Sequence, residues 1–249
     1  MCTLSFLPLK NSYIAAMNRD EQRTRVAALP PAIHEGAGLP TLYPQEPDGG
    51  TWIGGTARGK LLALLNWYSK EPARLGQKQR SRGEIIPAIL AEATTESTDR
   101  TLRQLSLVGL FPFRLFGFFP LEQAIHEWCW DTRALETKSY EWGRHHWFSS
   151  SCSDTKAAIW RGAACERAWR EDPGDPAAWL RKRHASHDPE PGPFSICVHR
   201  EDAATVSYTE VQWDDRGLQM RYHAGNPCQA EATFAMTYLP ALLESSKPR

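Results

Sequence analysis

Two short apolar runs open the chain, "TLSFLPL" and "YIAAMNRD", and the polar residues Lys10, Asn11 and Ser12 separate them. Two such runs around a short polar break predict a β-hairpin. A second pair of strands is predicted in "GGTWIGGTARGKLLALLNWY", around a glycine-rich turn. Its second strand, "LLALLN", is apolar at consecutive positions, so we expect it to be buried on both faces. Residues 22–50, rich in proline, glycine and charge, predict a long excursion that covers a site.

The apolar spacing becomes helical after Ser81. One helix is predicted at residues 85–90 and a second at residues 101–107. Two further helices are expected, one from Thr155 to about Glu171 with Asp154 as its N-cap, and one that begins at Asp175 and Pro176. Additional strands are predicted at "LFGFF", "AIHEWCWDT", "ALETKSYEW", "FSICVHR", "ATVSYTEVQW" and "LQMRYHA".

This order of elements predicts the fold class. Strands, helices, strands, helices and strands follow one another without a convincing linker or repeat, so residues 1–249 are expected to form a single domain. Such an order is typical of an α+β fold in which two antiparallel sheets pack together and helices cover their outer faces.

Length, charge and cysteine content restrict the class of protein. The 249 residues suffice for a core without disulfides or metals. Lys plus Arg number 29 and Asp plus Glu number 29, so no net charge favours nucleic acid or an anionic membrane. No apolar run predicts a membrane span, and residues 1–17 lack the features of a signal peptide, so we expect a soluble, cytoplasmic protein. Six scattered cysteines without a CxxC pair favour reduced thiols.

Cys2 is the first candidate for chemistry. Removal of Met1, which a small second residue permits, would place a thiol and a free α-amine on the same residue. With an ordinary pKa of about 7.7–8.0, against about 8.5 for the thiol, this amine can accept the thiol proton directly or through water, as in N-terminal nucleophiles. A cysteine near a terminus also occurs by chance, so position alone leaves both interpretations open.

Five segments in the first third of the chain resemble one family. They are "MCT" at the start, "NRDE" at residues 18–21, "GGTWIG" at 49–54, "GKLLALLNW" at 59–67 and "SRGE" at 81–84. In this order they resemble the NRDE family, the family of transport and Golgi organisation protein 2. That family is more remotely similar to the N-terminal-cysteine amidohydrolases, which include bile salt hydrolases and penicillin V acylases. The resemblance implies a four-layer αββα fold of the Ntn-hydrolase type.

The resemblance also implies a catalytic group of four residues. Cys2 corresponds to the nucleophile of the cysteine amidohydrolases, and Arg19 and Asp20 resemble the arginine and aspartate that flank it. An arginine near a thiol lowers its pKa, and a carboxylate can hold a terminal ammonium. Adjacent strand residues point to opposite faces, so only one of the two, with Arg19 favoured for its reach, is expected close to the thiol. Asn66 stands where those hydrolases often place an amide donor for the oxyanion. Without the resemblance, an ion pair and a turn contact explain these residues equally well.

Substrate contacts are predicted at four further positions. Trp52 and Trp67, beside the glycine-rich turn, are candidates to line an apolar cleft near the nucleophile. Arg200 is a candidate distal arginine of the site. Related proteins tend to carry a Ser-Asn pair after the central strands, whereas "HHWFSSSCSD" has three serines at residues 149–151 and no asparagine. We therefore expect a serine hydroxyl, that of Ser151, in place of the second donor.

Two functions remain open at this stage. In the first, Cys2 attacks the amide or thioester carbonyl of a small apolar acyl substrate, as an amide hydrolase or acyl transferase. In the second, implied by the family's association with haem mobilisation and acyl-CoA handling, the chain is a non-catalytic carrier of haem or lipid in intracellular trafficking. No cofactor is predicted, and haem is expected only as a carried ligand. No metal site is predicted either, because His145 and His146 point to opposite faces of a strand and Cys152 completes no set of four ligands.

Overall fold

The computed structural model describes residues 2–35, 38–72, 79–188, 190–229 and 233–242. Its strands are β1 (Cys2–Leu9), β2 (Ser12–Gln22), β3 (Leu29–His34), β4 (Thr41–Gln45), β5 (Ile53–Thr56), β6 (Leu61–Asn66), β7 (Phe113–Phe119), β8 (Ala124–Trp130), β9 (Leu135–Tyr140), β10 (His145–Ser149), β11 (Ala203–Asp214), β12 (Gly217–Ala224) and β13 (Ala235–Pro240). Its helices are the 3-10 turn η1 (Arg82–Glu84), α1 (Ile85–Ile89), α2 (Thr95–Gln104), α3 (Asp154–Glu171) and α4 (Pro176–His184).

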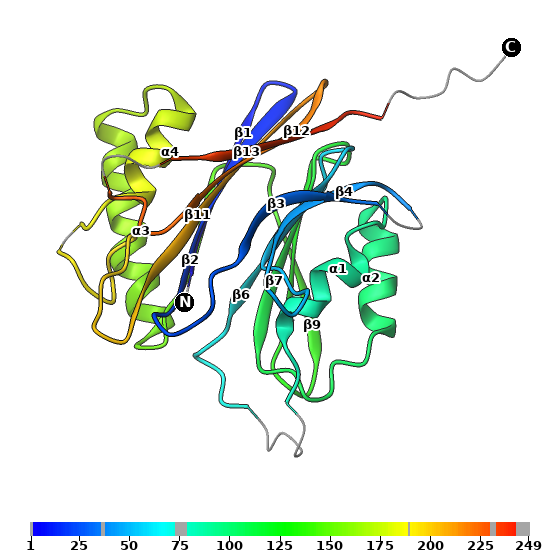
Figure 1. The fold of residues 1–249 in the computed structure, drawn as a ribbon, viewed down its shortest axis with the longest axis horizontal. Helices are drawn as coiled ribbons and strands as arrows, with labels where there is room; N and C mark the ends of the chain where they lie inside the picture. Colours follow the sequence, from blue (N-terminus) through cyan, green and yellow to red (C-terminus); the bar gives the residue numbers. More distant parts are fainter. Residues whose placement is uncertain (1, 36–37, 73–78, 189, 230–232, 243–249) are drawn as a thin grey trace, which may run out of the picture.

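Two antiparallel sheets form the centre of the molecule, and helices cover the outer face of each (Figure 1). One sheet has six strands in the order β10-β1-β2-β11-β12-β13, and α3 and α4 pack on it. The other has seven strands in the order β3-β4-β5-β6-β7-β8-β9, and α1 packs on it beside α2. The predicted α+β class, a four-layer αββα sandwich, is confirmed.

Three apolar layers hold these elements together. Leu4, Phe6 and Met17 belong to the layer between the two sheets, whereas Ile14 belongs to the layer between the six-stranded sheet and α3 and α4. In β6, Leu61 and Ala63 face the other sheet, whereas Leu62 and Leu64 face α1 and α2. This strand is therefore buried on both faces, as its unbroken apolar run predicts.

The opening hairpin sets the position of Cys2. Strands β1 and β2 pair in register from Leu9 and Ser12 to Cys2 and Arg19. Asn11 in the two-residue turn has a φ of 58°, a left-handed conformation that asparagine tolerates better than most residues. Because β1 also pairs with β10, Cys2 begins an inner strand of the sheet, as the sequence predicts.

Several predicted elements differ from the structure. The excursion at residues 22–50 contains two strands, β3 and β4; β3 includes Pro30 and Pro31, which an edge strand tolerates. The helix predicted at residues 101–107 is α2, which begins earlier, where Thr94 and Ser97 form a capping box. The N-cap of α3 is Ser153 instead of the next residue. Sequence patterns did not indicate β10 or β13, which are short strands at the edges of the six-stranded sheet.

The segment "FSICVHR" is a further difference, because it forms no strand. Its one ladder contact is an isolated bridge between His199 and Ala204. The backbone N–H of Cys197 donates to the carbonyl of Ser186, and that of Val198 donates to a side-chain hydroxyl. The segment is largely buried, but its backbone hydrogen bonds are irregular: the N–H of Thr205 in β11 donates to the carbonyl of Val198 at 3.0 Å, and other bonds go to a loop and to side chains. None of the helices in the described part of the chain is both long and apolar enough to cross a membrane.

Lys60 is an unusual residue of this core, since its side chain is buried and the residue is only 2% exposed. Its Nζ donates to the carbonyl of Ile89 at 3.1 Å and to Oγ1 of Thr98 at 3.3 Å. Burial lowers the pKa of Lys60 to about 7, although the charge of Glu92 opposes this effect. Above this pKa the folded protein therefore holds the Lys60 side chain mainly as the neutral amine.

Replacing Lys60 with methionine is expected to change how stability depends on pH. Between the folded pKa of about 7 and the ordinary value of 10.5, the unfolded chain binds more protons than the folded one, so stability rises with pH. For Lys60→Met, this rise between pH 7 and pH 9 should be smaller by about 2 kcal/mol. Urea unfolding at both pH values measures it, with the exposed Lys138→Met as control. Equal slopes in wild type and Lys60→Met would contradict the prediction.

Candidate active site

A cavity of about 310 Å³ lies beside the Cys2 end of the opening hairpin. Its lining includes Cys2, Arg19 and Asp20 from the six-stranded sheet, together with Trp52 and Asn66 from the other sheet and its connections. The volume is at the lower end of the range for small-molecule sites. All four residues of the predicted catalytic group are thus brought to one concavity, although their catalytic roles stay predictions.

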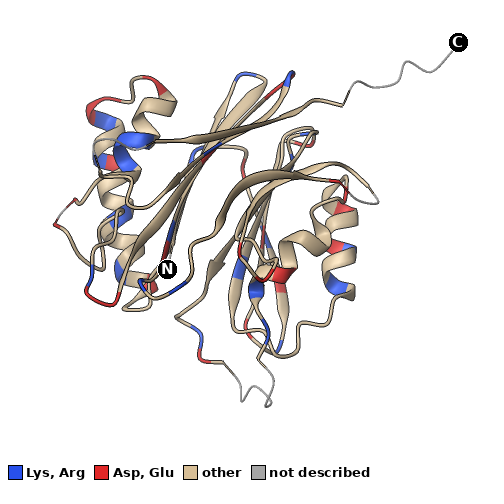
Figure 2. Ribbon diagram, in the orientation of Figure 1, with Lys and Arg blue, Asp and Glu red and all other residues tan. Residues whose placement is uncertain are grey.

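A larger cavity, of about 470 Å³, lies at the opposite end of the same hairpin, where Leu9 and Ser12 contribute to its wall. No cysteine or histidine is among its described lining residues. Volume alone therefore does not identify the site, and we place the candidate at the smaller cavity because it contains the chemistry-bearing side chains. Charged residues of both signs are spread over helices and loops across the molecule (Figure 2), so overall charge does not select a face.

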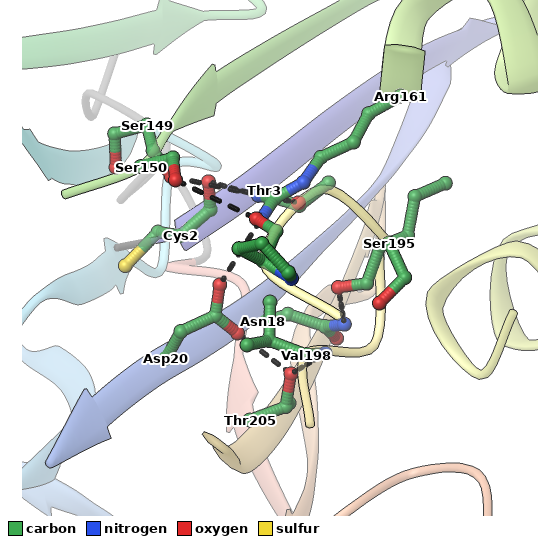
Figure 3. A network of polar contacts seen from close by, with 12 residues as sticks. Cys2, Thr3, Asn18, Asp20, Ser149, Ser150, Arg161, Ser195, Val198 and Thr205 are labelled. Atoms are coloured by element: carbon green, nitrogen blue, oxygen red, sulfur yellow. Dashed lines mark hydrogen bonds and ion pairs between the residues drawn. The ribbon is translucent and has the colours of Figure 1, made fainter. Parts of the chain in front are cut away.

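Strand alternation separates the two residues that flank Cys2. Cys2 and Arg19 are direct partners in the antiparallel ladder, with α-carbons ~4.5–5.5 Å apart, and their side chains share the face between the sheets. Asp20 follows on the other face and points toward α3 (Figure 3). Only its backbone N–H donates to the Cys2 thiol. Arg19 therefore lies on the same face of the sheet as the Cys2 thiol, whereas its role in catalysis stays a prediction.

Arg19 nevertheless has other partners. Its guanidinium pairs with Glu46 and stacks over the Trp52 ring at 4.5 Å from the centroid. Glu46 also accepts from Arg25 at 2.8 Å. Arg19 thus builds the cavity wall, and part of the 22–50 excursion covers the site through Arg25 and Glu46, as expected.

The electrostatics of Cys2 differ from those expected for an activated thiol. Burial raises the pKa of Cys2, the charge of Asp20 also raises it, and Arg19 lowers it by less than burial raises it. The residue is 7% exposed. With Met1 attached, the thiol is therefore less acidic than a free cysteine, and activation would depend on the amine that loss of Met1 creates at Cys2 itself.

A buried ionic network lies behind Cys2. Arg161 of α3 donates to the carbonyl of Cys2 at 3.3 Å and to Oγ1 of Thr3 at 2.9 Å, and it pairs with Asp20 at 3.8 Å (Figure 3). Oδ1 of Asp20 also accepts from Oγ1 of Thr205 at 2.6 Å. Burial raises the pKa of Asp20, whereas the Arg161 charge lowers it. The network fixes the start of β1 from the side of α3, and the Cys2 sulfur points away from Arg161 (Figure 3).

Sequence patterns did not single out Arg161, although a signal for it exists. Ala157, Arg161, Ala164 and Cys165 have helical spacing and are all buried in α3. One arginine on the buried face of a helix needs partners for its charge, since an unpaired buried charge is very costly. This signal indicates that Arg161 is paired, but it does not identify the partner.

Ser149 is a better candidate than Ser151 for the second donor. Ser149 is the ladder partner of Cys2 on β10, so both side chains lie on the same face. Its Oγ is buried and makes no hydrogen bond within the described residues. Ser151 is exposed and accepts from Arg200 at 3.2 Å. Neither serine is among the described residues that line the cavity, so the preference for Ser149 rests on its pairing with Cys2.

Of the neighbouring candidates Asn66 and Trp67, the structure brings only Asn66 to the cavity. Asn66 lines the cavity, and its Nδ2 donates to the hydroxyl of Tyr68 at 2.9 Å. Trp67, the next residue, is absent from the described lining, and Lys70 covers its ring at 5.1 Å from the centroid. Trp52 is thus the tryptophan that the structure brings to the site.

The cavity is charged instead of apolar. Besides the residues above, its described lining includes Glu21, Asp48, Arg80 and Arg82. Arg82, which the "SRGE" motif contains, lies over the Phe111 ring and donates to the carbonyl of Pro112 at 3.1 Å. Within the described part of the chain it pairs with no carboxylate. The predicted apolar cleft is therefore replaced by a polar one with a guanidinium available to a ligand.

The fold is similar to that of Ntn hydrolases. The structure resembles penicillin V acylase from Agrobacterium tumefaciens, with a TM-score of 0.54 and 13% identity over 96% of this chain and 86% of that one. It also resembles a point variant of conjugated bile acid hydrolase from Clostridium perfringens, with a TM-score of 0.50 and 12% identity over 99% and 100% of the two chains. At these identities the likeness establishes the fold alone. No curated protein matches the sequence significantly.

The family is established by sequence. The model of the Transport and Golgi organisation 2 family matches residues 1–157. The chain belongs to that family, as its "NRDE" and "SRGE" segments predict.

Proposed function

We propose that this chain is an N-terminal-cysteine hydrolase or acyl transferase whose nucleophile is Cys2. The observation that supports it most directly is the position of Cys2, which begins an inner strand and lines a cavity that also contains Asn66. Once Met1 is removed, the new α-amine takes the thiol proton, and the sulfur attacks an amide or thioester carbonyl. A carbon–sulfur bond forms, the old carbon–nitrogen or carbon–sulfur bond breaks, and the leaving group takes the proton. Water or an amine then releases the acyl group.

Two side chains are suited to stabilise the oxyanion of this reaction. Asn66 lines the cavity, and its Nδ2 has a second N–H besides the one donated to Tyr68; Oγ of Ser149 lies buried on the Cys2 face without a hydrogen bond in the described structure. Each oxyanion donor contributes on the order of 100-fold or more to turnover. The proposal therefore gives the second donor position to Ser149 instead of Ser151.

The charge of the cavity indicates the substrate class. Arg82 is partly buried and lines the same cavity as Cys2. Desolvation lowers its pKa, an effect that the negative form of the Cys2 thiol opposes. A guanidinium in this position favours a planar anion such as a carboxylate. We therefore propose an acyl substrate that carries a negative charge, in place of the small apolar acyl group predicted from sequence.

A pair of thioesters tests the proposal. The processed protein, shown by intact mass to lack Met1, is mixed with glutaryl or pentanoyl N-acetylcysteamine, and thiol release and acyl adducts on Cys2 are measured. We expect kcat/KM to favour the glutaryl compound by about 10-fold or more, since one ion pair of this kind contributes at least about 1.4 kcal/mol. Arg82→Gln should remove the preference, whereas Arg58→Gln, an exposed residue outside the cavity, should retain it.

The carrier hypothesis predicts a different outcome. A carrier would give no thiol release and no adduct on Cys2, but saturable binding of haem or an acyl thioester that survives Cys2→Ala. No histidine is among the described residues of the cavity wall, so an axial haem ligand there would have to be a residue such as Cys2. If fully processed protein gives no thiol release and no adduct on Cys2, but binds haem or an acyl thioester saturably, the proposed function is overturned.

A further inference from the structure

Two histidines and two cysteines outside the Cys2 site converge on one point. They are His187 after α4, Cys197 and His199 before β11, and Cys228 after β12, and one ligand atom from each lies within 4.8 Å of all the others. We propose that these four residues bind a zinc ion. The site is independent of the proposed function, because none of the four lines the cavity at Cys2.

The two distances from His199 to the cysteine sulfurs fit a tetrahedral metal. Zinc bonds of ~2.3 Å to sulfur and ~2.0–2.1 Å to nitrogen, at tetrahedral angles, place neighbouring ligand atoms about 3.3–3.8 Å apart. Nε2 of His199 lies 3.6 Å from Sγ of Cys197 and 3.3 Å from Sγ of Cys228. Two thiolates and two imidazoles form the closed donor set of structural zinc sites, with no position left for substrate.

The second histidine is oriented for the same role. Nε2 of His187 is buried and makes no hydrogen bond in the described part of the chain. Its ring lies at 85° to that of His199, with centroids 4.8 Å apart, so the two imidazoles approach from different directions. A buried imidazole nitrogen without a hydrogen bond is costly, and coordination of a metal would remove that cost.

A neighbouring residue supplies the outer contact that metal-bound histidines usually have. The side-chain amide of Asn226 lies 3.3 Å from Nδ1 of His199. With Nε2 of His199 on the metal, Nδ1 carries a proton, which the amide oxygen of Asn226 accepts when that amide is turned over. The backbone N–H of Cys228 also donates to the thiol of Cys197. Such contacts fix ligand orientation and strengthen metal binding.

The ion would hold together two loops behind the Cys2 site. Segment 186–199 contains three of the ligands, and its Val198 N–H donates to Oγ1 of Thr205 at 2.8 Å. Thr205 in turn donates to Asp20. The carbonyl of Ile196 accepts from Nδ2 of Asn18 at 3.0 Å. Zinc would thus tie the "FSICVHR" segment, which lacks strand pairing, to the loop after β12.

Metal analysis of the whole protein tests this inference. We expect about one equivalent of zinc per chain after purification under reducing conditions, measured by inductively coupled plasma mass spectrometry. Cys228→Ser should lower the content at least 10-fold, whereas Cys152→Ser, an exposed cysteine outside the group, should leave it unchanged. Cobalt added to chelator-treated wild type should show the visible absorption of tetrahedral cobalt with thiolate ligands. Neither measurement depends on acyl turnover.

Several outcomes would overturn the proposed zinc site. Reduced wild type that contains no metal and takes up neither zinc nor cobalt has no such site. A metal content unchanged in Cys228→Ser places the ion elsewhere, and a Cys197–Cys228 disulfide in the purified protein assigns the pair to redox chemistry. If Cys228→Ser does not fold, His187→Ala, at a partly exposed position, provides the same comparison.

Discussion

Replacing Cys2 with serine is expected to abolish acyl turnover while the fold is retained. Cysteine and serine have nearly the same size. Cys2 is 7% exposed and packs between β2 and β10, so serine can replace it without leaving a cavity. A hydroxyl is far less acidic than a thiol, so an α-amine positioned for a cysteine removes its proton much less readily. Loss of a nucleophile lowers turnover by on the order of 10³-fold or more. The measurement is kcat/KM for the anionic thioester, with circular dichroism to verify folding.

Two comparisons separate chemistry from packing in this experiment. Cys152→Ser removes an exposed cysteine and should leave turnover unchanged. A chain with a residue added before Cys2 that blocks processing keeps the thiol but loses the amine, and it should be as inactive as Cys2→Ser. Full activity of the unprocessed chain would show that the α-amine is not the base and would contradict the proposed mechanism.

The parts of the site that sequence predicts are those determined by local structure. The spacing of two apolar runs around Lys10 to Ser12 is enough to place Cys2 opposite Arg19, because a hairpin register follows from its turn. The buried strand β6 likewise ends at Asn66, which places this residue at the end of an inner strand. Both arrangements depend on residues close together in the chain.

The parts that sequence does not predict depend on long-range contacts. Glu46 neutralises Arg19 from a turn 27 residues away, and Arg161 reaches Cys2 from 159 residues away. The proposed zinc ligands extend from His187 to Cys228 without a CxxC or HxxxH spacing, so no motif indicates them. Segment "FSICVHR" has the composition of a strand, but a loop, the start of β11 and side chains provide the partners of its backbone, and composition does not reveal such partners.

The largest effect on stability is expected at Arg161. Its guanidinium is fully buried and holds Asp20 together with the carbonyls of Cys2, Ser149 and Pro193. Arg161→Met keeps most of the volume but leaves the Asp20 charge buried without its cationic partner. Breaking a buried ion pair in this way costs about 3–5 kcal/mol. Urea unfolding should show this loss, whereas Arg216→Met, in an exposed pair with Asp214, should change the midpoint little.

The double variant Arg161→Met/Asp20→Asn identifies the cause of that loss. Asparagine removes the buried charge, so the double variant should be more stable than Arg161→Met alone, and the gain should depend on pH. Burial already raises the pKa of Asp20, and loss of Arg161 raises it further. Because the folded pKa lies above the unfolded one, stability of Arg161→Met falls as pH rises from about 4 through the folded pKa. Its deficit should therefore be smaller at pH 4.5 than at pH 7, and Asn at position 20 should remove that difference. A deficit that is the same at both pH values and unaffected by Asp20→Asn would instead assign the role of Arg161 to the carbonyls at the start of β1.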